Sequence, residues 1–158
     1  METICTAARA LLYASGFVTI SLYLAFAMRN LDTRMPAAIP PTPIGLVLIV
    51  AGAAFALSSI TAFIAKGRGT PAPFDAPRRF VAVWPYSIVR NPMYIGGLSA
   101  LTGLALYLGS LAMLVFAILW GMFAHLFVVL YEEPVLRAKF GREYETYCAR
   151  VPRWFPWR

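Results

Sequence analysis

A polar stretch at residues 79–97 contains side chains that could take part in chemistry. It lies between two strongly apolar regions. It brings Arg90, Asn91 and Tyr94 together where a new apolar helix is expected to begin. Asn91 followed by Pro92 is typical of a helix start, with Asn as the N-cap and Pro at the first helical position. The backbone N–H groups of a helix start are unpaired and favour an anion nearby. The stretch is therefore a candidate binding site.

An acidic pair, Glu132 and Glu133, directly follows the last long apolar segment. A carboxylate at the end of a membrane span costs free energy unless it is paired or hydrated. Two interpretations stay open: the pair forms salt bridges with Arg90 or Arg137, or it binds a ligand. His125 lies seven residues before Glu132, so the two are expected to share a helix face. For this His, a hydrogen-bonded core position is favoured over a catalytic role.

Several common kinds of active site are excluded by the sequence. The chain has one His and two Cys without metal-ligand spacing, so we expect no metal site. It has no Gly-x-Ser-x-Gly motif and no P-loop, and Gly67-x-Gly69 lacks the strand and third glycine of a dinucleotide site. The remaining candidates are Tyr86, Arg90, Asn91, Tyr94, His125, Glu132 and Glu133.

The composition indicates an integral membrane protein. Of the 158 residues, 60% are hydrophobic and 13% are charged, whereas soluble domains are about a quarter charged. The net charge of +7 fits basic residues that flank membrane spans and contact anionic lipid headgroups, so membrane lipids rather than nucleic acid are the expected partners. We expect one membrane domain over residues 1–158.

Apolar segments predict an all-α bundle of about four transmembrane helices. The uncharged run from Met93 to Tyr131 would span nearly 60 Å as one helix, about twice the hydrocarbon thickness. Gly109-Ser110 near its middle therefore predicts a helical hairpin. A retained first span is favoured over a cleaved signal peptide. The predicted spans are residues 10–28, 44–65, 93–108 and 111–131.

Charge predicts the orientation of the bundle. With the N-terminus inside, twelve of the fourteen Lys and Arg residues are cytoplasmic, and only Arg29 and Arg34 lie outside. Both termini are then cytoplasmic. Beyond the last span, residues 136–147 place apolar side chains at helical spacing, which predicts an amphipathic helix at the interface. The segments 78–97 and 132–153 thus meet at the cytoplasmic face.

At this point two motifs resemble a known family. The first is Pro85-Tyr86-x-x-Val89-Arg90-Asn91-Pro92-x-Tyr94-x-Gly96, and the second combines Glu132-Glu133 with Phe140-Gly141-x-x-Tyr144-x-x-Tyr147 and Val151-Pro152-Arg153. Together they resemble the membrane methyltransferases typified by isoprenylcysteine carboxyl methyltransferase and phospholipid N-methyltransferase. The resemblance covers roughly the C-terminal half, from Gly67 onward.

The resemblance implies S-adenosylmethionine as the methyl donor and a lipophilic acceptor that enters from the bilayer. An amine acceptor would have to be neutral, and Glu133, His125 or Tyr94 would take its proton. The residues implied to line the cofactor are Arg78, Arg79, Phe80, Val81, Tyr86, Arg90, Asn91, Pro92, Met93, Tyr94 and Glu132.

Three positions depart from the family pattern. Asn91 replaces the usual His and loses any titratable role, and Trp84 replaces the Gly before Pro-Tyr. Val128 stands where the eukaryotic isoprenylcysteine enzymes have an Arg for the substrate carboxylate, so a prenylcysteine substrate is not supported. Two alternatives stay open: an NADPH-dependent membrane reductase of the sterol-reductase type, and a small transporter or structural membrane protein without chemistry.

Overall fold

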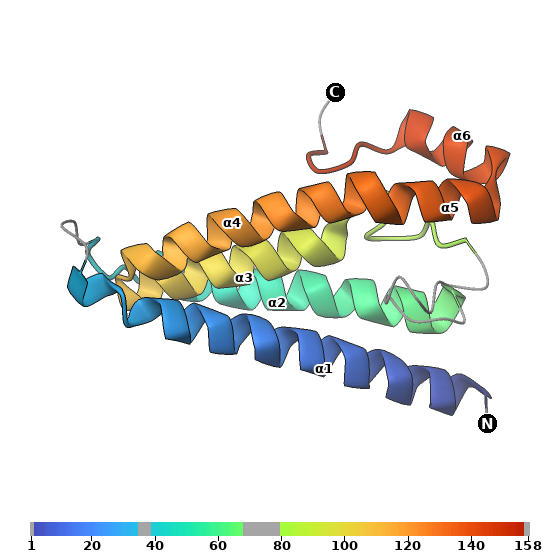
Figure 1. The fold of residues 1–158 in the computed structure, drawn as a ribbon. Coiled ribbons are helices and arrows are strands. Elements are labelled where there is room, and N and C mark those ends of the chain that lie inside the picture. Colours follow the sequence, from blue (N-terminus) through green and yellow to red (C-terminus); the bar gives the residue numbers. More distant parts are fainter. Residues whose placement is uncertain (1, 35–38, 68–79, 157–158) are drawn as a thin grey trace.

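The computed structural model describes residues 2–34, 39–67 and 80–156, and within these ranges the regular secondary structure is helical. Helices α1 to α4 form the bundle, and α5 and α6 follow at one end of it (Figure 1). The helices are α1 (Glu2–Arg29), α2 (Ile44–Ala62), α3 (Pro92–Leu108), α4 (Leu111–Phe127), α5 (Glu133–Phe140) and α6 (Arg142–Arg150).

Three helical segments are long and apolar enough to cross a membrane: Ala8–Arg34, Ile44–Gly67 and Leu111–Phe140. The fourth predicted span, α3, has 17 residues and a length of about 25 Å, slightly less than the hydrocarbon thickness. The predicted class, a multi-pass membrane helical bundle, is confirmed. The N-terminal end of α1 lies at the same end of the bundle as α5 and α6, which we call the site end (Figure 1).

The predicted hairpin between α3 and α4 is confirmed at Gly109 and Ser110. Gly109 ends α3 with φ of +64°, a left-handed conformation that glycine adopts without steric cost. The Ser110 hydroxyl accepts a hydrogen bond from Met113 N, and Asp32 Oδ1 accepts one from Ala112 N at 2.8 Å. These two caps satisfy N–H groups at the start of α4.

Helices α2 and α3 pack through paired glycines. A Cβ atom added at Gly52 would lie 2.5 Å from Gly96 O, and one added at Gly45 would meet Gly103 O still more closely. The two backbones therefore touch along most of α3, as small residues allow in membrane helices. This contact fixes the start of α3, which carries Asn91 and Tyr94, against the last turns of α2.

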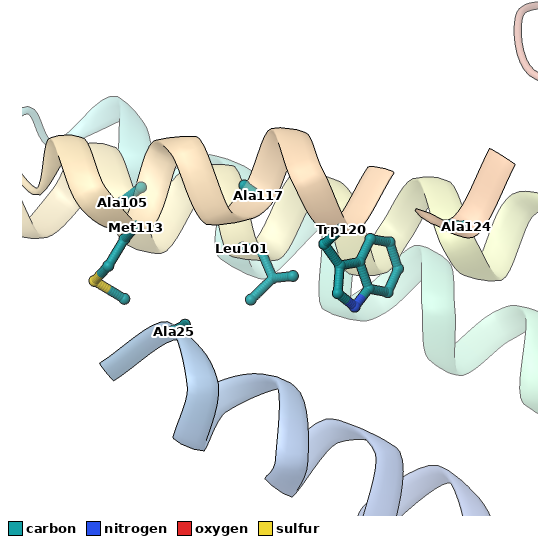
Figure 2. Close-up of a cluster of buried hydrophobic side chains, with 7 residues drawn as sticks. All are labelled: Ala25, Leu101, Ala105, Met113, Ala117, Trp120 and Ala124. Carbon is teal, nitrogen blue, oxygen red and sulfur yellow. The ribbon is translucent and has the colours of Figure 1, made fainter. Parts of the chain in front are cut away.

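Small side chains also let α1 approach the α3–α4 hairpin. Ala25 of α1 faces Met113, and Trp120 of α4 points toward α1 (Figure 2). Trp120 Nε1 donates a hydrogen bond to Ser21 Oγ at 3.3 Å, which satisfies both polar groups in an apolar setting. The cluster comprises Ala25, Leu101, Ala105, Met113, Ala117, Trp120 and Ala124.

The helical structure continues past the last predicted span. Helix α4 continues through a π-helical turn, Val128–Glu132, directly into α5. Within that turn Glu133 N donates to Val128 O, five residues back. The single amphipathic helix expected over residues 136–147 is instead two helices, separated at Gly141, where φ is +50°.

Candidate active site

A small cavity at the site end, which we call the inner cavity, brings seven of the predicted site residues together. Its volume is about 40 Å³, and it lies between the ends of α2 and α4, the segment before α3, and helices α5 and α6. The predicted residues in its wall are Phe80, Val81, Tyr86, Arg90, Asn91, Glu132 and Glu133. Arg78 and Arg79 lie outside the residues that the structure describes.

Glu133 is the centre of a buried ion-pair cluster. Its Oε1 accepts hydrogen bonds from Arg90 Nη1 at 3.0 Å and from Arg153 Nε at 2.7 Å, and its Oε2 accepts one from Arg153 Nη2 at 3.1 Å. Arg137 Nη2 lies 3.8 Å from the same carboxylate. For Glu133, salt-bridge formation is therefore the correct interpretation. Because its oxygens are already occupied by guanidinium donors, Glu133 is poorly suited to take a proton from a substrate.

Glu132 has a different environment from its neighbour. Its Oε2 accepts a hydrogen bond from the hydroxyl of Tyr94 at 3.0 Å. Among the described residues, no ion pair involves Glu132, although Glu132 lines the inner cavity as Glu133 does. Consecutive helical residues point in different directions, so Glu133 is held by three arginines while Glu132 bonds Tyr94.

Arg90 and Asn91 connect the start of α3 to the segment after α6 through hydrogen bonds. Asn91 is the N-cap residue, as predicted, but its side chain makes no capping bond; Nδ2 donates instead to Arg153 O at 3.1 Å. Arg90 N donates to Pro152 O at 2.9 Å, and its Nη1 also contacts Cys148 Sγ at 2.8 Å. Arg90 Nε is buried and has no hydrogen-bond partner among the described residues.

Aromatic residues form the rest of the inner wall. Phe63 packs edge-on against Tyr86 with ring centroids 4.9 Å apart, and Tyr147 Oη donates to Tyr86 O at 2.7 Å. Burial raises the pKa of the Tyr86 hydroxyl well above its usual value and also raises that of Tyr147, so both remain neutral donors. Phe80 contacts Tyr147 and Phe140 across the cavity.

Two larger apolar cavities lie on either side of Tyr94. The lateral cavity, about 790 Å³, is bounded by α3, α4 and the C-terminal segment, and the α1 cavity, about 320 Å³, lies between α1, α2 and α3. Tyr94 and Trp120 line both of them, and Met93 lines the α1 cavity. Because the Tyr94 hydroxyl also bonds Glu132, Tyr94 connects the apolar cavities with the inner cavity.

His125 does not share a cavity with Glu132, which corrects the prediction of a common helix face. It lines the lateral cavity, whereas Glu132 lines the inner one. The π-helical turn between them adds a residue to the helical repeat and so rotates Glu132 away from the face of His125. His125 Nδ1 accepts a hydrogen bond from Trp154 Nε1 at 3.0 Å.

The C-terminal segment holds contacts that residue types alone did not reveal. Arg153 contacts both Glu133 and Asn91, and Trp154 contacts His125 and Tyr94. The family resemblance included Arg153 in a motif, but nothing in the sequence paired Trp154 with His125. The substituted Trp84 is exposed, packs against Phe55 and lies outside the inner wall, whereas Val128 is buried in it.

These features define a multi-pass membrane protein with a polar cavity at one end of its bundle and apolar cavities beside it. Residues 41–143 match the sequence profile of the phospholipid methyltransferase family. The chain therefore belongs to that family, and it is an S-adenosylmethionine-dependent methyltransferase that acts on a membrane lipid. A comparison with curated proteins gave no match. The family assignment decides against the reductase and non-enzymatic alternatives.

Proposed function

We propose that S-adenosylmethionine binds at the inner cavity and that an amine-bearing phospholipid headgroup reaches it from the lateral cavity. The observation that carries this proposal is the position of Tyr94, whose hydroxyl bonds Glu132 in the inner wall while its ring lines the lateral cavity. A residue between a polar and an apolar cavity suits a reaction that joins a water-soluble donor to a lipid acceptor.

The unpaired groups of the inner cavity fit the charges of the cofactor. The cofactor has a cationic sulfonium, an amino group and a carboxylate. Glu132, which has no ion pair among the described residues, suits the cationic groups, and the unpartnered N–H of Arg90 suits the carboxylate. Tyr86 supplies an aromatic face of the kind that attracts cations. The predicted Arg78, Arg79 and Pro92 stay in the proposed contact set, whereas Met93 lines the α1 cavity.

The inner cavity has to widen for this role. A volume of about 40 Å³ accommodates little more than water, whereas pockets for small molecules have roughly 300–1,000 Å³. The ring of Phe80 contacts the rings of Phe140 and Tyr147, and all three line the inner cavity. We infer that these rings separate when the cofactor binds.

Tyr94 and Glu132 are proposed to handle the proton of the acceptor. When bound, S-adenosylmethionine supplies an electrophilic methyl group on its sulfonium, and a neutral amine forms a C–N bond as the C–S bond breaks. Tyr94 lies between the lateral cavity and Glu132, so its hydroxyl takes the amine proton as its own proton passes to Glu132 Oε2. Glu133 and His125 are less suited, because Arg90, Arg153 and Trp154 occupy their accepting atoms.

The lining of the lateral cavity supports an amine in preference to a carboxylate acceptor. No Lys or Arg is among the described residues that line this cavity. Val128 in the inner wall also supplies no cation. At the reacting position, a carboxylate acceptor of the isoprenylcysteine type would therefore lack a counter-charge, whereas a neutral amine needs none there.

Calorimetry on the purified protein in detergent tests the cofactor site. Wild-type protein is expected to bind S-adenosylhomocysteine and S-adenosylmethionine, and Glu132→Gln is expected to weaken S-adenosylmethionine binding by about tenfold or more because a charged contact is lost. Glu145→Gln, an isosteric change at an exposed site on α6, serves as the control and is expected to bind normally. Full affinity in Glu132→Gln would remove Glu132 from the cofactor site.

A further inference from the structure

We propose that His125 is a headgroup-binding residue of the acceptor site, which donates a hydrogen bond from Nε2 to a phosphate oxygen of the lipid, and that Trp154 is the residue that positions it. This inference rests on the proposed function, because it concerns the lipid that occupies the lateral cavity. It adds a recognition element beyond the inner cavity.

The indole of Trp154 determines which nitrogen of His125 can donate. Trp Nε1 is a donor only, so the ring nitrogen that it contacts at 3.0 Å, Nδ1 of His125, must carry a lone pair. The proton of the neutral imidazole is then on Nε2. Among the described residues, no group accepts a hydrogen bond from this Nε2–H, and His125 lines the lateral cavity. The lateral cavity thus contains an N–H donor, Nε2 of His125, that has a fixed position and no acceptor among the described residues.

Trp154 is itself held firmly in place. The preceding residue, Arg153, donates two hydrogen bonds to Glu133, and its carbonyl accepts one from Asn91. The ring of Trp154 packs edge-on against Tyr94 with centroids 6.5 Å apart. The hydrogen bonds of Arg153 with Glu133 and Asn91 therefore also place the indole of Trp154 against His125. Figure 1 shows the segment after α6 running back beside α4.

The groups around the lateral cavity match the groups of a phospholipid. Tyr94, whose hydroxyl bonds Glu132, marks the position where an amine would react. His125 lies near Tyr94, because the ring of Trp154 contacts both of them. Elsewhere the wall is apolar, with Ile118 and Leu114 on α4. The amine, the phosphate and the acyl chains would then meet Tyr94, His125 and this apolar wall.

Nuclear magnetic resonance tests the proposal directly, because the chain has a single His. In ¹⁵N-histidine-labelled protein in mixed micelles, we expect a protonated Nε2 and an unprotonated Nδ1. Trp154→Phe, which keeps an aromatic ring but removes the N–H donor, is expected to give a mixture of tautomers. Trp84→Phe removes an exposed indole that does not contact His125 and is expected to leave the spectrum unchanged. A proton on Nδ1 in the wild type would overturn the inference.

Two short-chain lipids then identify the bound group. Phosphatidylethanolamine is expected to shift the Nε2 signal, and a diacylglycerol with the same chains, which has ester carbonyls but no phosphate, is expected to leave it in place. Equal shifts with both lipids would exclude phosphate as the partner. These spectra require neither cofactor nor turnover, so they separate a failure of this inference from a failure of the cofactor site.

Kinetics with the same lipid test the functional consequence. His125→Leu is expected to raise the KM for phosphatidylethanolamine by about tenfold, because a hydrogen bond to a charged group is lost, with an unchanged Kd for S-adenosylhomocysteine. His125→Gln is expected to restore most of the affinity, since its amide donates from a similar place. Trp154→Phe is expected to raise KM less and to add nothing to His125→Leu. An unchanged KM in His125→Leu would also refute the proposal.

Discussion

The hydroxyl of Tyr94 donates a hydrogen bond to Glu132 Oε2 at 3.0 Å, between residues 38 positions apart in the chain. This bond joins the first turn of α3 to the π-helical turn that ends α4. Because the Tyr94 ring also lines the lateral cavity, the pair connects the space proposed for the cofactor with the space proposed for the lipid.

Tyr94→Phe tests the proposed proton transfer. The substitution keeps the ring in both apolar cavities and removes only the hydroxyl that contacts Glu132. We expect kcat to fall by about 100-fold, a typical contribution of general acid–base catalysis, with an unchanged KM for the lipid. Tyr107→Phe, an exposed position on the same helix, is the matched control. Wild-type kcat in Tyr94→Phe would exclude the hydroxyl as a proton acceptor.

Glu132→Gln and Glu133→Gln make the same chemical change at adjacent residues, and we expect opposite effects on stability. Glu133→Gln leaves Arg90 and Arg153 without a charged partner in a buried cluster, a loss of about 3 kcal/mol by analogy with broken buried ion pairs. Glu132→Gln removes a carboxylate that has no ion pair among the described residues, so stability is maintained or raised.

Thermal unfolding in detergent, followed by circular dichroism, measures both variants. The midpoint is expected to fall markedly for Glu133→Gln and to stay at or above that of the wild type for Glu132→Gln. Similar midpoints for the two variants would show that the arginine cluster does not stabilise the site end. The exposed Glu145→Gln provides the baseline.

The broad architecture was predictable because it depends on local properties of the sequence. Uncharged segments of membrane length indicated the helices, and a charge-free run about twice the bilayer thickness required a turn at Gly109 and Ser110. The family motifs placed Asn91 and Glu132 near one another, and both line the inner cavity. These inferences needed no knowledge of side-chain contacts.

The distribution of roles within the site depends on tertiary contacts that no local pattern encodes. Residue types alone did not separate Glu132 from Glu133, because the difference arises from Arg153, twenty positions farther along the chain. The π-helical turn that moves His125 away from Glu132 has no sequence signal that we recognised. The contact between Trp154 and His125 joins residues 29 positions apart, which no local pattern indicates.

Gly52→Ala tests the close packing of α2 on α3. A Cβ at this position would lie 2.5 Å from Gly96 O, so the two backbones would have to separate. We expect a lower unfolding midpoint and weaker cofactor binding, because α3 carries Asn91 and Tyr94. Gly16→Ala on α1, where a Cβ meets nothing within 4 Å, is the control and is expected to be neutral or slightly stabilising. Equal midpoints for the two variants would contradict the packing argument.

The site end is proposed to face the cytoplasm, since that orientation places twelve of the fourteen basic residues inside and gives a water-soluble cofactor access. Labelling of single cysteines in intact expressing cells with a membrane-impermeant maleimide tests this orientation. Cys5, an exposed residue near the N-terminal end of α1, is expected to react only after permeabilisation. Asn30→Cys, in a protein with both native cysteines replaced by Ser, lies at the opposite end and is expected to react in intact cells. The reverse pattern would place the site end, and therefore the cofactor site, outside the cytoplasm.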